Sequence, residues 1–423
     1  MKFYNPLLVK SSVLRVLCYY QHGLTRFALP SNYQPQIGIG SGGFGLALAV
    51  VDKYTGHQLC MKIVKDTFES ATHIRNTLRE IRILSTLRHP NLISLTDVFF
   101  GECGSKPAIC VATERMDVDL STLIESELLS PQKIRAFSCQ ILLGLHHLHT
   151  AGILHRDIKP GNILVNANGR VRICDFGLAR SIHALPDEDK GDFLSEYVHT
   201  CSYRAPEQIL SPGRYGFEAD LWAAGLCIIE MVRGERLFMK VNSHVHDRRR
   251  PLFTSVIRNQ VAFCGSLPEA ELKDFIKNES AIIFVKSCGK QRGVNMPRFL
   301  RRVHDCQPLA LVCTRLLSFN PLRRGSASDA LRLPYFSGLF KETMIGRPAD
   351  LLDLDIDRKR PKDLTDPQLS RFYVSALKAE VVQIQESLRS GQPRALIAQC
   401  GPACICASRK DGSDCQSTGD SSE

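Results

Sequence analysis

The chain has 423 residues, of which 44% are hydrophobic and 23% are charged, so it is long enough for a two-lobed globular domain with tails. No apolar run reaches the roughly 18 residues that a membrane-spanning helix needs, so we expect no membrane span. The net charge is +11, and the sixteen cysteines are scattered. This cysteine pattern indicates reduced thiols in the cytoplasm and nucleus rather than a disulfide-rich secreted protein.

The first 51 residues contain no Asp or Glu, and their only charged side chains are Lys2, Lys10, Arg15 and Arg26. A basic segment without acids, interspersed with apolar residues, is typical of an organellar transit segment. A short ordered extension to the domain that follows would have the same composition. We favour the extension and assign residues 1–32 to it.

A glycine-rich stretch comes next, with the sequence Gly40-Ser41-Gly42-Gly43-Phe44-Gly45. Its G-x-G-x-x-G pattern alone is weak evidence, because a dinucleotide-binding fold or a flexible loop would also contain it. Apolar residues then alternate over 46–50, a turn follows over 52–56, and a second apolar stretch covers 59–64. This order predicts two further strands, whereas a Rossmann unit would begin a helix directly after the glycines. We therefore expect the glycine backbone to close over phosphates.

Lys62 lies on the third predicted strand, from which its amine can reach the α- and β-phosphates of a nucleotide. A helix is predicted over 71–88, because apolar residues recur there at three- and four-residue steps. Glu80 lies outside that apolar stripe. We expect it to pair with Lys62 and hold the amine on the nucleotide. The alternative for both residues is an ordinary solvated position.

Two motifs in the middle of the chain carry the most chemistry. The first is His155-Arg156-Asp157-Ile158-Lys159-Pro160-Gly161-Asn162, and Asp175-Phe176-Gly177 begins thirteen residues after its end. Each motif alone means little, but together they supply a proton-handling carboxylate, a cationic amine and two metal-binding groups. Phosphoryl transfer from ATP needs this set, because its catalysis is mostly positioning and charge neutralisation.

With these motifs the chain resembles the eukaryotic protein kinases over about residues 33–337, three-quarters of its length. The resemblance continues through Ala205-Pro206-Glu207, the run 220–225 and Arg324. Lys159, two residues after Asp157, is typical of the Ser/Thr-specific members. Arg180 and the run Asp117-Val118-Asp119-Leu120 are similar to mitogen-activated protein kinases. The stretches 153–166 and 173–175 are most similar to the nemo-like branch of that family.

The resemblance implies an α+β, two-lobed protein kinase fold, with a β-rich N-lobe and a mainly helical C-lobe. The domain would cover residues 33–337, with the N-lobe at about 33–116 and the C-lobe at about 117–337. A family insert is expected at about 240–300. Residues 338–423 would form a C-terminal extension that is partly helical and then disordered.

The resemblance also implies the catalytic roles. Asp157 would orient the substrate hydroxyl and accept its proton, and Lys159 would neutralise the transferring phosphoryl group. Asn162 and Asp175 would hold the Mg²⁺ ions that bridge the phosphates of ATP. The expected catalytic set is Asp157, Lys159, Asn162, Lys62 and Glu80.

Further residues are expected to serve the fold of the site. His155 and Phe176 would pack in a hydrophobic spine, while Glu207 and Arg324 would form a buried ion pair that braces the C-lobe.

The nucleotide would lie between the glycine loop and the hinge. Thr113 would guard the back of the adenine pocket, the backbone of 114–116 would bind the adenine edge, and Asp119 would reach the ribose. Ala47 replaces the valine that commonly covers the adenine. The expected ATP-binding residues are Ile39, Gly40, Ser41, Gly42, Gly43, Phe44, Gly45, Ala47, Lys62, Thr113, Glu114, Met116 and Asp119.

Two regulatory phosphorylation sites are expected in the activation segment, at Ser195 and Tyr197. They occupy the T-x-Y position of mitogen-activated kinases, and Tyr197 departs from the nemo-like branch towards the extracellular-signal-regulated type. A phosphate on Tyr197 would need Arg204. A phosphate on Ser195 would receive charge-assisted hydrogen bonds that order the loop. The expected donors to it are Arg156, Arg180 and Arg79 or Arg75.

The expected partners are protein substrates with Ser-Pro or Thr-Pro sites, an upstream activating kinase and docking proteins. Val198 and Arg204 would shape a shallow pocket for the proline, and residues 264–300 resemble the docking insert of the family. The stretch 233–302 is strongly basic, and such a patch can attract nucleic acid or acidic partners, but we favour a solvated insert surface. We do not expect nucleic acid as a partner, because no aromatic residues are interleaved there to stack bases.

The C-terminal extension begins with a predicted helix over 370–389 that packs back on the domain. Beyond it, the cysteines at 400, 404, 406 and 415 lack the paired C-x-x-C spacing of zinc sites. Their neighbours are Gly, Ser and Asp, which favours a disordered tail.

Two functions from different classes stay open from the sequence. The first is an active Ser/Thr kinase in an intracellular signalling cascade, switched on by phosphorylation of its activation loop. The second is an inactive scaffold that binds partners through the kinase fold. Inactive members commonly lack the lysine or one of the two aspartates, and this chain keeps Lys62, Asp157 and Asp175. We therefore favour the enzyme.

Overall fold

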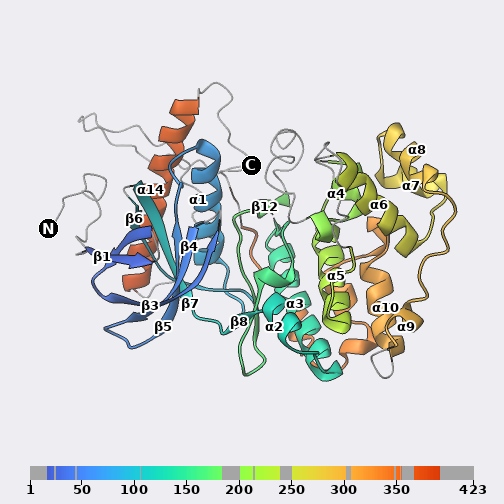
Figure 1. Ribbon diagram of the computed structural model, residues 1–423, viewed down its shortest axis with the longest axis horizontal. Coiled ribbons are helices and arrows are strands. Elements are labelled where there is room, and N and C mark those ends of the chain that lie inside the picture. Colours follow the sequence, from blue (N-terminus) through green and yellow to red (C-terminus); the bar gives the residue numbers. More distant parts are fainter. Residues whose placement is uncertain are drawn as a thin grey trace, which may run out of the picture.

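The chain forms two lobes, one built on a β-sheet and one built mainly of helices (Figure 1). This architecture, seen in a computed structural model, confirms the predicted α+β fold class. Within the described ranges, no helix combines the length and the hydropathy needed to cross a bilayer. The structure describes residues 17–22, 25–42, 45–104, 106–182, 201–212, 215–238, 250–301, 306–346, 349–352, 354 and 366–390.

The N-lobe sheet has seven strands in the order β1-β2-β6-β7-β5-β4-β3, and every neighbouring pair is antiparallel. The predicted succession of strand, glycine loop, strand, turn and strand is confirmed by β3, β4 and β5. No strand was predicted for β1 and β2, which extend the sheet on the side of β6. The strands are β1 (Leu17–His22), β2 (Thr25–Pro30), β3 (Tyr33–Gly42), β4 (Gly45–Asp52), β5 (Gln58–Val64), β6 (Leu95–Cys103) and β7 (Lys106–Glu114).

Strand β5 shows how the sequence positions a functional side chain. Leu59, Met61 and Ile63 alternate along it and are buried in the core on one face of the sheet. The residues between them point to the opposite face, because successive side chains of a strand alternate. Lys62 therefore projects towards the C-lobe side, where α1 (Ala71–Thr86) lies.

Helix α1 is the helix predicted over 71–88, and it starts at an N-cap. The Ser70 side chain accepts a hydrogen bond of 3.2 Å from the His73 backbone N–H, which satisfies one of the free donors of the first turn. Ile74, Leu78 and Ile81 recur along one face of α1 and are fully buried. Burial of this face sets the rotation of α1 about its axis.

A second helix lies along α1. It is α14 (Asp366–Ser390), drawn in orange-red beside α1 in Figure 1, and it corresponds to the helix predicted over 370–389. Arg82 of α1 donates to Glu380 of α14 at 3.0 Å, and Glu380 is almost fully buried. Gln385 donates to the backbone carbonyl oxygen of Val98 in β6 at 2.8 Å. The C-terminal extension thus holds both α1 and the sheet.

The C-lobe is organised around α5, whose residues 219–232 are all buried. Helices α3 and α10 pack on it. The helices are α2 (Leu120–Ser126), α3 (Pro131–Thr150), α4 (Pro206–Leu210), α5 (Glu218–Arg233), α6 (Arg250–Cys264), α7 (Glu269–Phe275), α8 (Glu279–Ser287), α9 (Met296–Phe299), α10 (Cys306–Leu316), α11 (Ala327–Leu331) and α12 (Thr343–Gly346).

Short strands line the side of the C-lobe that faces the sheet. They form a three-stranded sheet, β11-β10-β8, and a two-stranded pair, β12-β9. A single hydrophobic cluster runs from α1 through these strands to α5, so the two lobes share one core. The strands are β8 (Val118–Asp119), β9 (Ile153–Leu154), β10 (Ile163–Val165), β11 (Val171–Ile173) and β12 (Arg180–Ser181).

The predicted ion pair between Glu207 and Arg324 is present and fully buried. Two nitrogens of Arg324 donate to the two carboxylate oxygens of Glu207, at 2.6 and 2.8 Å. Arg324 also donates to the carbonyl oxygens of Ser318, at 2.8 Å, and Glu218, at 2.9 Å. The guanidinium therefore ties α4 to the start of α5 and to the turn after α10.

We predict that Arg324→Met lowers the free energy of unfolding by about 3–5 kcal/mol, because it leaves the Glu207 carboxylate buried without its counter-ion. Denaturant titration followed by circular dichroism measures the loss. The matched control is Arg323→Met, since Arg323 pairs with Glu271 at the surface with 63% of its side chain exposed. The control should cost at most about 1 kcal/mol. Equal losses in the two variants would contradict the prediction.

Two histidines meet where the lobes join. His89, after α1, stacks on His147 of α3 with ring centroids 4.8 Å apart. The backbone N–H of Asn91 donates to Nδ1 of His89 at 3.1 Å, which requires that nitrogen to be unprotonated. Burial, aided by the charges of nearby groups, lowers the pKa of His89 to about 4. The folded protein thus favours the neutral form of the His89 side chain.

This pKa predicts a loss of stability in mild acid. Between pH 6.5 and 4 the unfolded chain binds the proton on residue 89 and the folded chain does not, so the free energy of unfolding falls as the pH falls. The loss is at most about 3 kcal/mol, because one pKa unit corresponds to about 1.4 kcal/mol. His89→Asn should flatten the pH dependence of the denaturation midpoint over this range. The exposed control, His57→Asn, should keep the wild-type slope, and an unchanged slope in His89→Asn would contradict the assignment.

Candidate active site

Lys62 is the centre of a buried charge cluster between the lobes. Its Nζ donates to Oε1 of Glu80 in α1 at 2.7 Å and to Oδ1 of Asp175, after β11, at 3.2 Å. Burial would lower the pKa of Lys62, but the negative charges of Asp175 and Glu80 outweigh it and raise the pKa above its ordinary value. Lys62 is therefore a cation, and the pairing with Glu80 expected from the sequence is present.

The two carboxylates respond differently to that cation. Burial would raise the pKa of Asp175, but the charge and hydrogen bond of Lys62 lower it below its ordinary value. Burial is the largest effect on Glu80 and raises its pKa, although Lys62 opposes this. The Lys62 charge thus favours the ionised form of Asp175, which is the form that binds a cation.

The segment 155–162 brings Asp157, Lys159 and Asn162 together. Oδ2 of Asp157 accepts hydrogen bonds from Nζ of Lys159 at 2.7 Å and from Nδ2 of Asn162 at 2.8 Å. Nδ2 of Asn162 also donates to the backbone oxygen of Asp157 at 2.8 Å. Oδ1 of Asp157 is buried and has no hydrogen-bond partner among the residues that the structure describes. One carboxylate oxygen is therefore fixed, and the other is left to accept a proton or hydrogen bond from a ligand.

The backbone at the start of this segment is held by Asp220, which lies in the first turn of α5. Its carboxylate accepts from the backbone N–H groups of His155, at 2.8 Å, and Arg156, at 2.9 Å. Burial would raise the pKa of Asp220, but the hydrogen bond and charge of His149 and the nearby His155 lower it. Arg156 has a φ of 72°, a left-handed conformation that is costly for a side chain with a Cβ. The two hydrogen bonds that Asp220 accepts stabilise that turn.

This role of Asp220 was not predicted, since the residue was noted only as part of the run 220–225. The available signal was a single acidic residue within the otherwise apolar run 219–229, because a carboxylate buried with such a run needs buried donors.

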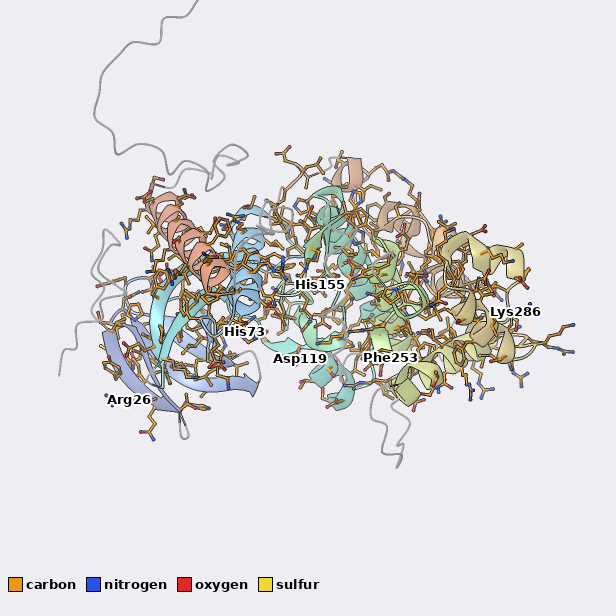
Figure 2. All side chains as sticks on the ribbon, turned by 90° about the horizontal axis from the view of Figure 1, so that it is seen from above. Arg26, His73, Asp119, His155, Phe253 and Lys286 are labelled. Carbon is orange, nitrogen blue, oxygen red and sulfur yellow. The ribbon has the colours of Figure 1, made fainter. Side chains whose placement is uncertain are left out.

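His155 links the two motifs. Its Nε2 lies 3.0 Å from the carbonyl oxygen of Cys174, and its ring packs edge-on against Phe176 with centroids 5.4 Å apart. Both side chains are buried, as expected for packing residues. In Figure 2 His155 and Asp119 lie between the strands of the N-lobe and the helices of the C-lobe. Asp175 follows with a φ of 65°, so both motifs contain a left-handed turn.

The glycine loop joins β3 to β4. Gly45 has a φ of 132°, and a Cβ there would lie 2.0 Å from the carbonyl oxygen of Ile63, so only glycine fits. A Cβ at Gly40 would meet nothing within 4 Å, which leaves open space beside that backbone. Ile39 is half exposed, and Gly43 and Phe44 lie outside the described residues. The backbone of Ser41 and Gly42 continues β3.

Of the other residues expected to bind the nucleotide, Ala47 lies on β4, Lys62 on β5 and Thr113 on β7. Ala47 pairs with Lys62 in the ladder, and Thr113 pairs with Cys60, so Ala47 and Thr113 flank β5 on its two sides. Met116 is buried in the shared core.

Asp119 has a structural role that the sequence did not predict. Its two carboxylate oxygens accept from the backbone N–H and the hydroxyl of Thr122, at 3.0 and 2.7 Å, and so cap α2. A ribose contact would have to share these oxygens.

The donor set fits a magnesium nucleotide. Mg²⁺ is bound through oxygen ligands, commonly one or two from the protein and the others from phosphates and water. Asp175 offers its second carboxylate oxygen. Asn162 offers its amide oxygen, because its nitrogen is already held by Asp157. Across the described ranges, no three His, Cys, Asp or Glu side chains group so as to hold a metal ion by themselves. The protein ligands therefore suit a metal that arrives with phosphate.

The predicted phosphorylation sites, Ser195 and Tyr197, lie outside the described residues, as does Val198. The arginines expected to hold a phosphate come from three elements. Arg75 and Arg79 lie one turn apart on α1, Arg156 lies in the segment 155–162, and Arg180 lies on β12.

Comparison with known proteins gives a consistent result. The model of the family described as protein kinase domain matches residues 33–336. Mitogen-activated protein kinase 7 of Arabidopsis thaliana is 35% identical over 348 residues, which are 80% of this chain and 88% of that protein. Mitogen-activated protein kinase 4 of Oryza sativa subsp. japonica is 35% identical, over 76% of this chain and 83% of its own. Mitogen-activated protein kinase homolog 1 of Petunia hybrida is 36% identical, over 76% and 80%.

Two glycines of the loop allow the site to be tested without touching a charged group. Gly45→Ala should lower the free energy of unfolding by at least about 1–2 kcal/mol, because it strains the backbone and crowds Ile63. Gly40→Ala should leave the midpoint of thermal unfolding unchanged and weaken binding of magnesium ATP, since its methyl group fills the open space. Differential scanning fluorimetry and calorimetric titration measure the two effects. Unchanged nucleotide affinity in Gly40→Ala would contradict the placement of phosphates at this strand.

Proposed function

Since the chain belongs to the protein kinase family and, within it, to the mitogen-activated protein kinases, we propose that this cleft performs the phosphoryl transfer through Asp157, Lys159, Asn162 and Asp175. The protein is a serine/threonine kinase of mitogen-activated signalling, which transfers the γ-phosphate of ATP to protein hydroxyls. The observation that carries the residue assignment is the buried, unpartnered Oδ1 of Asp157.

Asp157 acts on the substrate hydroxyl. Lys159 and Asn162 hold its Oδ2, so that Oδ1 has a fixed position from which to accept the hydroxyl hydrogen. The same Lys159 cation lies next to where negative charge builds up on the phosphoryl group. The three side chains thus orient the nucleophile and neutralise the transferring group.

Lys62, Asn162 and Asp175 hold the nucleotide. Mg²⁺, when bound, neutralises charge on the phosphate oxygens. Asp175 and Asn162 supply its protein ligands, while Lys62, kept cationic by Glu80 and Asp175, binds the α- and β-phosphates. The hinge backbone at 114–116 binds the adenine edge, with Thr113 behind it and Ala47 above it.

The substrate site lies next to Asp157. The carbonyl oxygen of Arg204 accepts from Nε2 of the fully buried Gln260 in α6, at 2.8 Å, and the hydroxyl of Tyr203 donates to Glu230 in α5, at 2.5 Å. These contacts hold residues 203–204 in place as a rigid wall of the substrate site. The substrate residue that follows the phosphorylated Ser or Thr would bind against this wall. We propose that this wall accepts proline, so that the substrates carry Ser-Pro or Thr-Pro sites.

Regulation follows from the same family membership. We propose that an upstream kinase phosphorylates Ser195 and Tyr197, and that Arg156, Arg180 and the arginines of α1 receive the Ser195 phosphate. The assignment to the nemo-like branch stays a prediction. We further propose that the insert at 264–300 docks partner proteins and that the kinase acts in the cytoplasm and nucleus, where its reduced cysteines fit. The eleven cysteines with described side chains are all free thiols.

Transfer of labelled γ-phosphate to Ser-Pro and Thr-Pro peptides tests the proposal. Asp157→Asn should lower kcat by about 10²–10⁴-fold, because the hydroxyl proton loses its acceptor. Asp175→Asn should abolish magnesium-dependent transfer. Asp274→Asn, an exposed carboxylate on α7, is the matched control and should keep the wild-type rate. Replacing the substrate proline by alanine should reduce kcat/KM.

The outcomes separate the two functions left open by the sequence. Transfer that is indifferent to proline would remove the specificity assignment and keep the enzyme. If wild-type protein phosphorylated at Ser195 and Tyr197 transfers nothing, the scaffold function replaces the catalytic one.

A further inference from the structure

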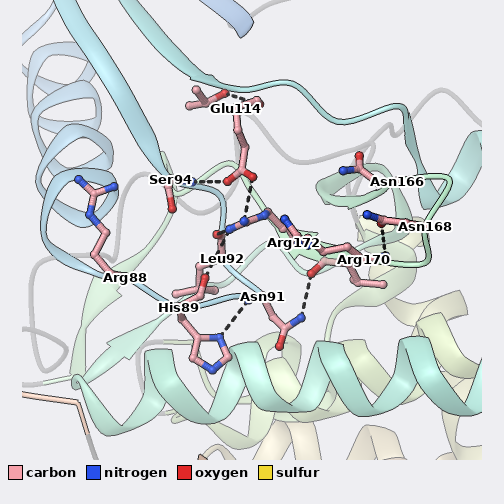
Figure 3. Close-up of polar contacts among 12 residues, drawn as sticks. Arg88, His89, Asn91, Leu92, Ser94, Glu114, Asn166, Asn168, Arg170 and Arg172 are labelled. Carbon is pink, nitrogen blue, oxygen red and sulfur yellow. Dashed lines mark hydrogen bonds and ion pairs between the residues drawn. The ribbon is translucent and has the colours of Figure 1, made fainter. Parts of the chain in front are cut away.

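A polar network outside the charge cluster joins the hinge to the C-lobe (Figure 3). Nη2 of Arg172, in β11, contacts Oε2 of Glu114, the last residue of β7, at 2.8 Å. The other oxygen of Glu114 accepts from the backbone N–H of Ser94, at 3.3 Å. Glu114 is thus held from two sides, although the proposed function uses only its backbone.

The same guanidinium reaches a third segment. Nη1 of Arg172 donates to the carbonyl oxygen of Leu92 at 2.6 Å, in the loop that joins α1 to β6. Only 12% of the Arg172 side chain and 28% of the Glu114 side chain are exposed. A single side chain therefore links the hinge, the loop after α1 and β11 away from bulk solvent, where such contacts are screened less.

The backbone reinforces this connection. The loop after α1 runs beside β11 and pairs with it in parallel, with Ile93 N–H donating to the Ile173 carbonyl oxygen and Ile173 N–H donating to the Asn91 carbonyl oxygen, each at 2.9 Å. The side chain of Asn91 also donates to the carbonyl oxygen of Val171 at 3.0 Å. The loop and β11 therefore form one hydrogen-bonded unit, and Arg172 connects the hinge to this unit.

This arrangement spans the two ends of the nucleotide site. Strand β11 leads through Cys174 to Asp175, which would hold the metal on the phosphates, and Glu114 begins the hinge, which would hold the adenine. The distance between adenine and phosphates in ATP is limited by its covalent structure, and one bound conformation sets one distance. A site that binds both ends must keep the hinge and Asp175 at a matching separation, and a small error in such positioning is costly.

We propose that Arg172 is a positioning residue for ATP, which through its contacts with Glu114 and Leu92 fixes the separation between the hinge and Asp175. The inference rests on the proposed function and adds to it a residue that touches neither substrate nor metal. Arg170, on the same hairpin, provides the contrast, because it is exposed and its side chain forms no hydrogen bond or ion pair with the described residues of the hinge.

Steady-state kinetics and direct nucleotide binding test the proposal on the full chain. Arg172→Ala should raise KM for magnesium ATP, and its Kd measured by calorimetry, by about tenfold, the range expected when one buried positioning contact is lost. KM for the peptide should not change, because the substrate wall at Arg204 and Gln260 is separate. Arg172→Lys should recover part of the affinity, since it keeps the charge but not the paired geometry.

Two further variants make the result specific. Arg170→Ala is the matched control and should leave both constants at the wild-type values. Glu114→Gln combined with Arg172→Ala should weaken ATP binding no more than Arg172→Ala alone, because the two residues act through one contact. Thermal unfolding of each variant is measured alongside.

Three outcomes would overturn the proposal. An unchanged ATP affinity in Arg172→Ala, with a lowered unfolding midpoint, would show a role in stability only. An equal rise in KM for ATP and for peptide would show a general loss of structure. Higher activity of the variant without phosphorylation of Ser195 would show that the network restrains the kinase. Binding of ATP by the wild type without transfer would contradict the proposed function alone, and the Kd values would still decide the role of Arg172.

Discussion

The site depends on one ammonium group that is shared by two carboxylates from distant parts of the chain. The Lys62 side chain is 27% exposed, and Glu80 and Asp175 both lie within hydrogen-bonding distance of its Nζ, where they stabilise its charge. These contacts require β5, α1 and the segment after β11 to be in place together. The orientation of α1 and the closure of the lobes are therefore conditions for this charge cluster to form.

Local periodicity predicted the elements that carry these groups. Alternation over 46–50 and the apolar stretch over 59–64 predicted strands β4 and β5, and the three- and four-residue steps of α1 gave its boundaries within two residues. The pairing of Lys62 with Glu80 was inferred from what binding of a nucleotide requires, and that of Glu207 with Arg324 from the resemblance to kinases. They join residues 18 and 117 positions apart, and periodicity carries no information on such contacts.

Other features could not be predicted for the same reason. Strand β2 hydrogen-bonds to β6, some 75 residues further along, β1 pairs only with β2 in the described sheet, and the sequence of the two strands shows little alternation. The capping role of Asp119 was not predicted, because the resemblance supplied a role in the ribose site instead. Asp is nevertheless a common N-cap residue, whose side chain accepts a hydrogen bond from the backbone N–H three residues on, here that of Thr122. The same residue can thus be a helix N-cap and part of a family motif, and only the structure shows which contacts its carboxylate oxygens make.

The arrangement of α14 extends the argument beyond the matched domain. Glu80 and Arg82 lie two residues apart on α1, so that Glu80 binds Lys62 on the inner side while Arg82 binds Glu380 of α14. Glu380 is nearly fully buried, and a buried carboxylate needs its partner in a fixed place. The family model ends at residue 336, yet α1 is clamped between Lys62 and a helix that begins at 366. The position of Glu80 is consequently a property of the domain and its C-terminal extension together.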